Sequence, residues 1–312
     1  MSKGGLMKLV HSVKIDGRDY PIVRAGLVAS YYIAGSVRVV CPRIADSIES
    51  YVRLIGKHNL RSYEGEDGSA KTLTDRRVER DLKVLRNLPK SADGYDLLYS
   101  SEINGSIGQF GIFVAAHDQD EDFPQQTSLV RFEFGENAFS DFGENALKKF
   151  AVASALQLGI QSGNVGFGFK RASGFDEETT KIINRLLPRY LGFDPCYNDA
   201  ADEMLDHTMT AHWLNFLNNS LFTRCGGRQR FAVIAPSVPI EEIDNLIFIQ
   251  AARVPPVGDQ NMRALDLGCM PDVARFLSPI RVPLDGLGDD EFDVDSWLAR
   301  LDEIKSGPWE NV

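Results

Sequence analysis

Residues 9–34 read LVHSVKIDGRDYPIVRAGLVASYYIA, and this stretch indicates the fold class more clearly than any other. Apolar residues alternate with other residues from Leu9 to Ile15, which is the period of a strand with two unlike faces. Asp16-Gly17 then supplies a two-residue turn of the kind that joins antiparallel strands. Because residues 20–24 are extended and residues 26–34 are apolar, the stretch predicts a β-hairpin followed by a buried strand.

Helical and extended patterns follow this stretch without a regular βαβ alternation. Pro42 is placed to open a helix, since the first helical position needs no N–H, and apolar residues at 44, 48, 51 and 55 share one face. Further patterns predict helices at residues 75–87, 145–159 and 176–191, and strands at residues 108–116, 128–134 and 163–169. We therefore expect an α+β fold in which a mixed or mostly antiparallel sheet packs with helices in one large compact domain.

The C-terminal third continues the same mixture of elements. Trp213, Phe216, Leu217 and Leu221 predict one helix, which Gly226-Gly227 can end in the left-handed conformation. Residues 231–235 and 246–251 are typical of strands, and apolar residues after Asp293 predict a closing amphipathic helix. We expect residues 1–282 to form the α+β domain and residues 283–312 to form an acidic segment whose helix packs on it.

Composition excludes several broad classes of function. The 312 residues carry 34 lysines and arginines against 44 aspartates and glutamates, a balance that disfavours direct binding of nucleic acid. No apolar run reaches the length of about 20 residues that a bilayer-spanning helix needs. The four cysteines, at positions 41, 196, 225 and 269, are widely spaced, and the N-terminus has no apolar signal core, so we expect a cytoplasmic protein with reduced, packed thiols.

Charge is distributed unevenly along the chain. Residues 1–90 carry 17 basic and 10 acidic side chains, whereas residues 282–312 carry nine acidic and two basic ones. Acidic clusters can be solvated surface or a docking surface for a basic protein partner, whose association they would accelerate. The clusters that we take as candidate contacts with such a partner are Asp118, Asp120, Glu121 and Asp122, and Asp289, Asp290, Glu291 and Asp293.

Catalytic, metal-binding and cofactor-binding motifs are not recognisable. The chain has no phosphate-binding loop, dinucleotide fingerprint or nucleophile elbow. His207 and His212 lack the i, i+4 spacing of a zinc helix, so we interpret them as ordinary surface or interface histidines. Cys225, beside Arg224, is the one faint nucleophile, and a buried thiol at a helix end is the favoured interpretation. We therefore predict no catalytic residue, no metal, no cofactor and no enzymatic activity.

Four elements of the C-terminal two thirds resemble a known family. They are the run Trp213-Leu214-Asn215-Phe216-Leu217, the Cys225-Gly226-Gly227 turn, the segment Arg253 to Asn261 with its PxxGDxN pattern, and Phe276 to Arg281 with its LxPxR pattern. In this order and at this spacing they resemble the type VI secretion immunity family that is paired with VRR-type nuclease toxins. The resemblance extends over residues 20–282 and includes the glycine-rich residues 163–169 and the turn at residues 191–194.

The resemblance implies a cytoplasmic immunity protein, without catalysis or cofactor, that binds a toxin encoded by a neighbouring gene. We expect it to cover the DNA-binding or active site of a basic nuclease domain at one-to-one stoichiometry. The alternatives are an interaction protein for an effector that is not a nuclease, and an enzyme that reverses toxin damage. The oligomeric state stays open. We interpret the motif residues as fold determinants: Trp213, Leu217, Gly226, Gly227, Pro256, Gly258, Asp259, Asn261 and Pro279.

Overall fold

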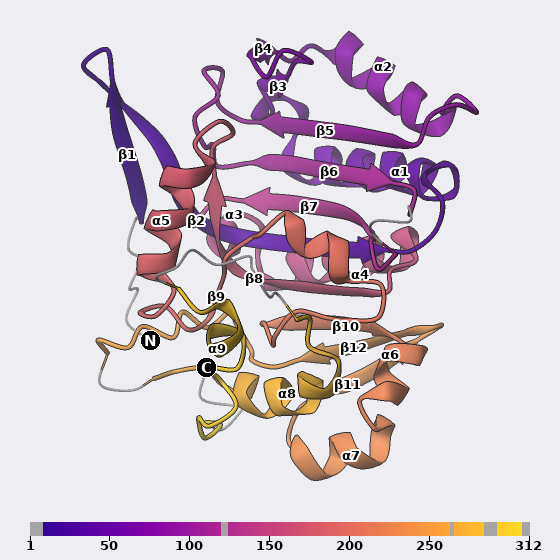
Figure 1. Ribbon diagram of the computed structural model, residues 1–312, viewed down its shortest axis with the longest axis vertical. Coiled ribbons are helices and arrows are strands. Elements are labelled where there is room, and N and C mark those ends of the chain that lie inside the picture. The colour runs from indigo at the N-terminus through magenta and orange to yellow at the C-terminus, as the bar shows by residue number, and fades with distance from the viewer. Residues whose placement is uncertain (1–8, 120–123, 263–264, 284–291, 308–312) are drawn as a thin grey trace.

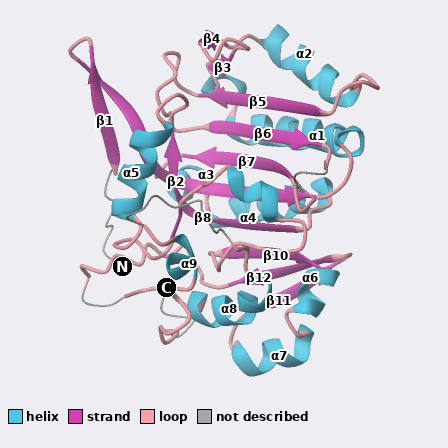
Figure 2. Cartoon of the chain, viewed as in Figure 1, coloured by secondary structure: helices cyan, strands magenta, loops and turns pink. Residues whose placement is uncertain are grey.

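The computed structural model describes residues 9–119, 124–262, 265–283 and 292–307. These residues form one compact unit in which a single twelve-stranded sheet is packed with helices (Figure 1, Figure 2). The predicted α+β class with a mostly antiparallel sheet is confirmed, because every strand pair is antiparallel except β8 with β9. Along the sheet the order is β11-β12-β10-β8-β2-β7-β6-β5-β3-β4, with β1 paired to β2 and β9 paired to β8.

The elements are as follows. The strands are β1 (Val10–Ile15), β2 (Arg18–Ile33), β3 (Ser62–Glu64), β4 (Ala70–Thr72), β5 (Gly94–Ser100), β6 (Gly111–His117), β7 (Ser128–Phe134), β8 (Ser162–Arg171), β9 (Phe193–Asp194), β10 (Leu214–Asn218), β11 (Ile240–Ile243) and β12 (Leu246–Gln250). The α-helices are α1 (Val37–Ile55), α2 (Asp75–Arg86), α3 (Ala138–Phe142), α4 (Glu144–Leu158), α5 (Asp176–Leu186), α6 (Asn219–Arg224), α7 (Gly227–Ile234), α8 (Met270–Leu277) and α9 (Val294–Leu298). Three short 3₁₀ turns are η1 (Lys57–Asn59), η2 (Asp199–Glu203) and η3 (Ser278–Ile280).

Strand β2 organises the sheet and unites the second strand of the predicted hairpin with the predicted buried strand in one continuous strand. It pairs with β1 through the turn at Asp16 and Gly17, whose φ angles are 49° and 77°. Positive φ at both central residues is what a tight antiparallel turn of matching twist requires, so the predicted hairpin is confirmed. Beyond the hairpin, β2 enters the sheet between β7 and β8 and becomes buried.

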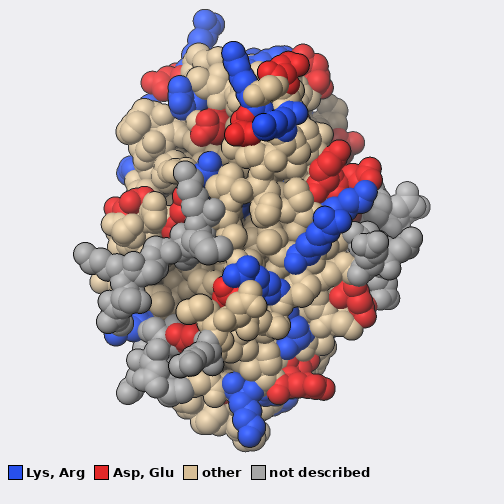
Figure 3. Space-filling model, turned by 90° about the vertical axis from the view of Figure 1, so that its left-hand side faces the viewer, with Lys and Arg blue, Asp and Glu red and all other residues tan. Residues whose placement is uncertain are grey.

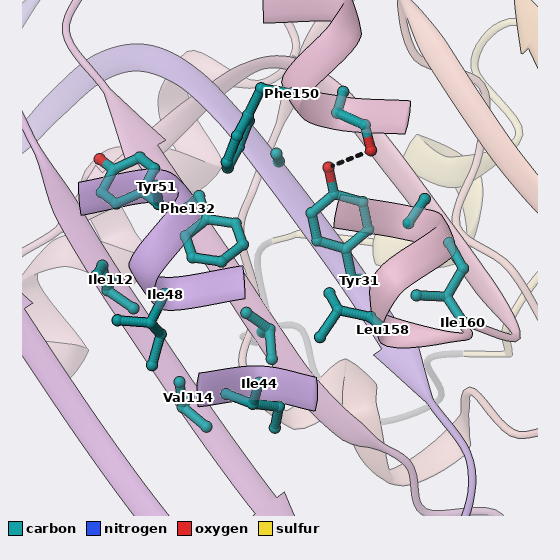
Figure 4. Packing of buried hydrophobic residues seen from close by; sticks show 14 of the residues in the cluster. Tyr31, Ile44, Ile48, Tyr51, Ile112, Val114, Phe132, Phe150, Leu158 and Ile160 are labelled. Atoms are coloured by element: carbon teal, nitrogen blue, oxygen red, sulfur yellow. Dashed lines mark hydrogen bonds between the residues drawn. The ribbon is translucent and has the colours of Figure 1, made fainter. Parts of the chain in front are cut away.

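The first hydrophobic core lies between the sheet and helices α1, α2 and α4. Tyr51 of α1 stacks on Phe132 of β7 with ring centroids 4.9 Å apart, and Phe150 of α4 meets Phe132 edge-on at 5.3 Å (Figure 4). The buried hydroxyl of Tyr31 donates to the Ala151 carbonyl at 3.0 Å, which satisfies the one polar atom of that ring. The predicted inner faces of residues 44–55 and 145–159 are confirmed.

A second core covers the other face of the sheet and includes the C-terminal segment. Val294, Trp297 and Leu298 of α9 are buried there with residues of α5 and β9. Arg300 donates from Nε and Nη2 to the Leu191 carbonyl at 3.0 and 2.7 Å. These contacts attach residues 292–307 to the sheet, and the helix predicted after Asp293 is confirmed.

Three predicted elements are wrong. Helix α1 begins at Val37 rather than at Pro42, so the proline lies inside the helix. Residues 214–218 form the central strand β10 instead of a helix, because they are buried between β8 and β12. Residues 231–235 fall mostly in helix α7 rather than in a strand, so the turn at Gly226-Gly227 joins two helices and not a helix to a strand.

Candidate functional site

Asp118, the first residue of the acidic loop, has a structural role. Its Oδ1 accepts from the backbone N–H of Val37 at 2.6 Å, although the two residues are 81 positions apart. Val37 is the first residue of α1, and Ser36 gives no side-chain cap, so Asp118 supplies the missing acceptor at that helix end. Asp120, Glu121 and Asp122 lie outside the described residues, and contact of this loop with a toxin stays a prediction.

Asp293, the last residue of the second acidic cluster, also caps a helix. Its carboxylate accepts from the Ser296 N–H at 3.0 Å and from the Ser296 hydroxyl at 2.6 Å. These bonds hold the pKa of the Asp293 carboxyl below its ordinary value. Asp289, Asp290 and Glu291 lie outside the described residues.

The family-motif residues in and beside β10 lie in the interior, whereas Gly226 of the turn after α6 is exposed and Gly227 is half-buried. Trp213 is buried, its Nε1 donates to the Ala252 carbonyl at 3.0 Å, and Leu217 is fully buried. Gly226 and Gly227 have φ angles of 95° and 62°, as expected for the left-handed region. Pro279 lies in η3, directly after α8.

Two motifs that are distant in sequence meet in the structure. The Leu191 N–H donates to the Gly258 carbonyl at 3.0 Å, and the Gly192 N–H donates to the Val257 carbonyl at 3.2 Å. Pro256 takes part in the same crossing, since its carbonyl lies directly over Gly192. The turn at residues 191–194 and the PxxGDxN segment therefore brace each other.

Asp259 fixes this crossing from its outer side. Its Oδ1 accepts from the Asn261 N–H at 3.0 Å, so the side chain caps its own turn. Both carboxylate oxygens also accept from Arg189, each at 3.0 Å, in a bidentate pair that the sequence did not reveal.

Of the groups considered for catalysis, Cys225 is buried and His207 is half-buried. Cys225 is buried, and burial raises the pKa of its thiol to about 12, so the reactive thiolate is disfavoured. His207 bonds the Glu203 carbonyl through Nδ1 at 2.7 Å. Within the described ranges, no three His, Cys, Asp or Glu side chains gather in a way that could hold a metal ion. Those ranges also contain no helix long and apolar enough to cross a membrane.

His212 is fully buried, so its interpretation as a surface or interface histidine is wrong. Its Nε2 lies 3.3 Å from Oδ2 of Asp194, which also accepts from Nδ2 of Asn164 at 2.6 Å. Desolvation lowers the pKa of His212 to about 4, against the opposing influence of Asp194 and with a smaller lowering by Arg300. The imidazole is therefore neutral near pH 7.

This burial predicts a pH dependence of stability. Because the pKa of His212 is lower in the folded chain than in the unfolded chain, the unfolded state binds the extra proton between pH 6.5 and about 4. The free energy of unfolding should therefore decrease as the pH is lowered from 6.5 to about 4, by about 3 kcal/mol at most. Denaturant unfolding at several pH values checks this, with His212→Gln as the matched variant. If the free energy of unfolding of this variant depends on pH between 6.5 and 4 as steeply as that of the wild type, the acid sensitivity arises from other groups.

A surface hollow lies where α2 stands over β5, a region that sequence patterns did not single out. It has a volume of about 920 Å³ and is lined from β3, β4, β5, β6 and α2 and from the loop after β3. Figure 1 shows that α2, β3, β4 and β5 lie at the end of the sheet away from α6, α7 and α8. Figure 3 shows the face on the side of β1 and α5, where acidic and basic side chains are interspersed around an uncharged centre.

Comparisons with known proteins agree with the fold and point to one family. The model of the family TsiV, described as type VI immunity for VRR-NUC, matches residues 43–311. No curated protein matches the chain. Among solved structures, the T6SS protein PA0821 of Pseudomonas aeruginosa superposes with a TM-score of 0.77 at 17% sequence identity, and the match covers 96% of this chain and 88% of that one.

Proposed function

The chain belongs to the TsiV family, type VI immunity for VRR-NUC, and from this premise we propose that it binds and neutralises a cognate VRR-type nuclease effector. In this proposal the chain occupies the effector's DNA-binding or active site at one-to-one stoichiometry and catalyses no reaction. The family match, which extends over residues 43–311, is the observation that carries the proposal. We place the protein in the cytoplasm, where the DNA that such an effector attacks is found, and we expect the effector's gene to be adjacent.

The acidic residues 118–122 and 289–293 stay proposed contacts with the effector. DNA-cleaving domains carry basic surfaces, and acidic groups on an inhibitor raise the rate of association with them. Asp118 and Asp293 also cap helices, so charge reversal at these two positions would disturb folding as well as binding. Tests of the acidic contacts are therefore cleaner at Asp120, Glu121 and Asp122.

Titration of DNA cleavage tests the proposal. The product of the adjacent gene is purified, and its cleavage of plasmid DNA is measured with increasing amounts of this chain. We expect cleavage to fall linearly and to stop near one chain per nuclease. This result requires tight binding of the nuclease, with a Kd of about 1 nM or below. Heat-denatured chain at the same concentration is the control.

Other outcomes separate the alternatives. Protection at far less than equimolar amounts would indicate turnover, and thus an enzyme that reverses toxin damage. A tight complex with an effector that does not cleave DNA would indicate immunity against another activity. Absence of any complex would contradict the proposal as a whole.

A further inference from the structure

Strand β5 has a free edge along most of its length. Strand β6 pairs with all of Gly94–Ser100, whereas β3 pairs with β5 only at Ser62–Ser100 and Tyr63–Tyr99. Within the described ranges, no strand pairs with residues 94–98 on the side of β3. Five extended residues at about 3.4 Å each give an open edge of about 17 Å.

The direction of the backbone groups on this edge follows from the hydrogen bonds at both ends of β5. Asp118 donates its N–H to the Asp93 carbonyl, and Ser101 donates to the Phe110 carbonyl, so odd-numbered residues bond toward β6. Arg61 donates to the Ser100 carbonyl, so even-numbered residues point the other way. The N–H and C=O groups of Gly94, Asp96 and Leu98 are therefore directed outward, toward the free edge.

The 920 Å³ hollow follows this edge and has two walls of different composition, one on each face of the sheet, which we call its banks. Alternate residues of a strand point to opposite faces, which places Tyr95 on the bank formed by α2 and Asp96 and Leu98 on the other. The α2 bank carries Arg77 and Arg80. The Asp96 bank carries Glu64 and the half-buried ring of Phe113.

The charged side chains of the two banks have different partners within the chain. On the α2 bank, Arg77 is engaged with the buried carboxylate of Asp81, which also accepts from the Tyr99 hydroxyl at 2.8 Å. On the other bank, the side chain of Asp96 is 71% exposed, and its Oδ1 lies 3.0 Å from Nε2 of His117. A carboxylate beside the apolar surface of Phe113 and Leu98 suits a lysine or arginine, whose stem lies on the apolar surface while its head reaches the charge.

We propose that an extended segment of the effector adds as a strand to the free edge of β5, with lysine or arginine side chains directed to the Asp96 bank. The proposal rests on the proposed function, because it names the contact through which the nuclease is held. Main-chain bonds to residues 94, 96 and 98 supply affinity, and the two banks select the side chains that alternate along the segment. The margins at β4 and β11 are shorter, with three and four residues.

Hydrogen exchange at single-residue resolution tests the strand addition. In the free chain, the amides of Tyr95 and Leu97 should exchange slowly and those of Asp96 and Leu98 quickly. On binding of the catalytically inactive VRR-type effector, the two fast amides should slow by about 100-fold or more, while the odd-numbered amides change little. A stable complex in which Asp96 and Leu98 keep their fast exchange would overturn strand addition and leave the proposed function intact. No complex would overturn both.

Proline substitution at Asp96 gives an independent test. Asp96→Pro removes an outward N–H, and edge strands accept proline when the lost donor is not in the ladder. We expect Asp96→Pro to weaken effector binding at least 10-fold beyond Asp96→Ala, which removes the carboxylate alone. Equal affinities of these two variants, with thermal unfolding that shows both to be folded, would contradict the main-chain contact. If the proline variant does not fold, the exchange measurement on the wild-type chain still decides.

Discussion

Gly192→Ala is expected to lower the free energy of unfolding by about 3 kcal/mol, or to prevent folding. A Cβ atom at this position would lie 2.1 Å from the Pro256 carbonyl oxygen and 2.9 Å from its carbon. Both atoms belong to the backbone, so no rotamer change can relieve the contact. The crossing of the turn at residues 191–194 with the PxxGDxN segment would have to open, and the bonds from Leu191 and Gly192 would be lost with it.

Gly135→Ala is the matched control for this prediction. Gly135 is also buried, but an added Cβ would meet only the side chain of Gln109, at 3.5 Å, which is an ordinary contact. Its stability should stay within about 1 kcal/mol of the wild type. Chemical denaturation of the wild type and the two variants gives the comparison. A Gly192→Ala protein as stable as the Gly135→Ala control would show that the two backbone segments can move apart at little cost in free energy.

Sequence patterns predicted those elements whose local signal agrees with their tertiary setting. The Asp16-Gly17 turn and the inner face of α1 both satisfy local rules that long-range packing does not override. Residues 214–218 fail for the opposite reason. They lie between β8 and β12 and are buried on both faces, so their apolar run has no period that separates a strand from a helix.

The site itself depends on contacts that join distant parts of the chain. Nothing near Asp118 in sequence indicates that its carboxylate caps a helix 81 positions away. The free edge of β5 exists because β3 is three residues long and pairs with β5 at two positions, a fact about strand pairing rather than composition. The PxxGDxN motif and the turn at residues 191–194 were both visible in the sequence, whereas their contact became identifiable only through the bonds between them.

Asp194→Ala is the second substitution for which we expect a large loss, of about 3 kcal/mol. Asp194 is a buried carboxylate that accepts from the Cys196 N–H and from Nδ2 of Asn164, both at 2.6 Å. Burial alone would raise the pKa of this carboxyl, but the electrostatic interactions with His212 and Arg131 and these two bonds outweigh it and lower the pKa. Removing the carboxylate leaves two buried donors without an acceptor and the guanidinium of Arg131 without its nearby anion.

Asp194→Asn separates the charge from the hydrogen bonds. The amide oxygen can still accept from Cys196 or Asn164, so thermal and denaturant unfolding should show a smaller loss than for alanine. Because Asp194 favours the charged form of His212, the pKa of His212 should fall below about 4 in both variants. The decrease in stability between pH 6.5 and 4 should then persist in both variants, since it arises from burial of the imidazole. If either variant lost that pH dependence, desolvation of His212 would not be the cause of the acid sensitivity.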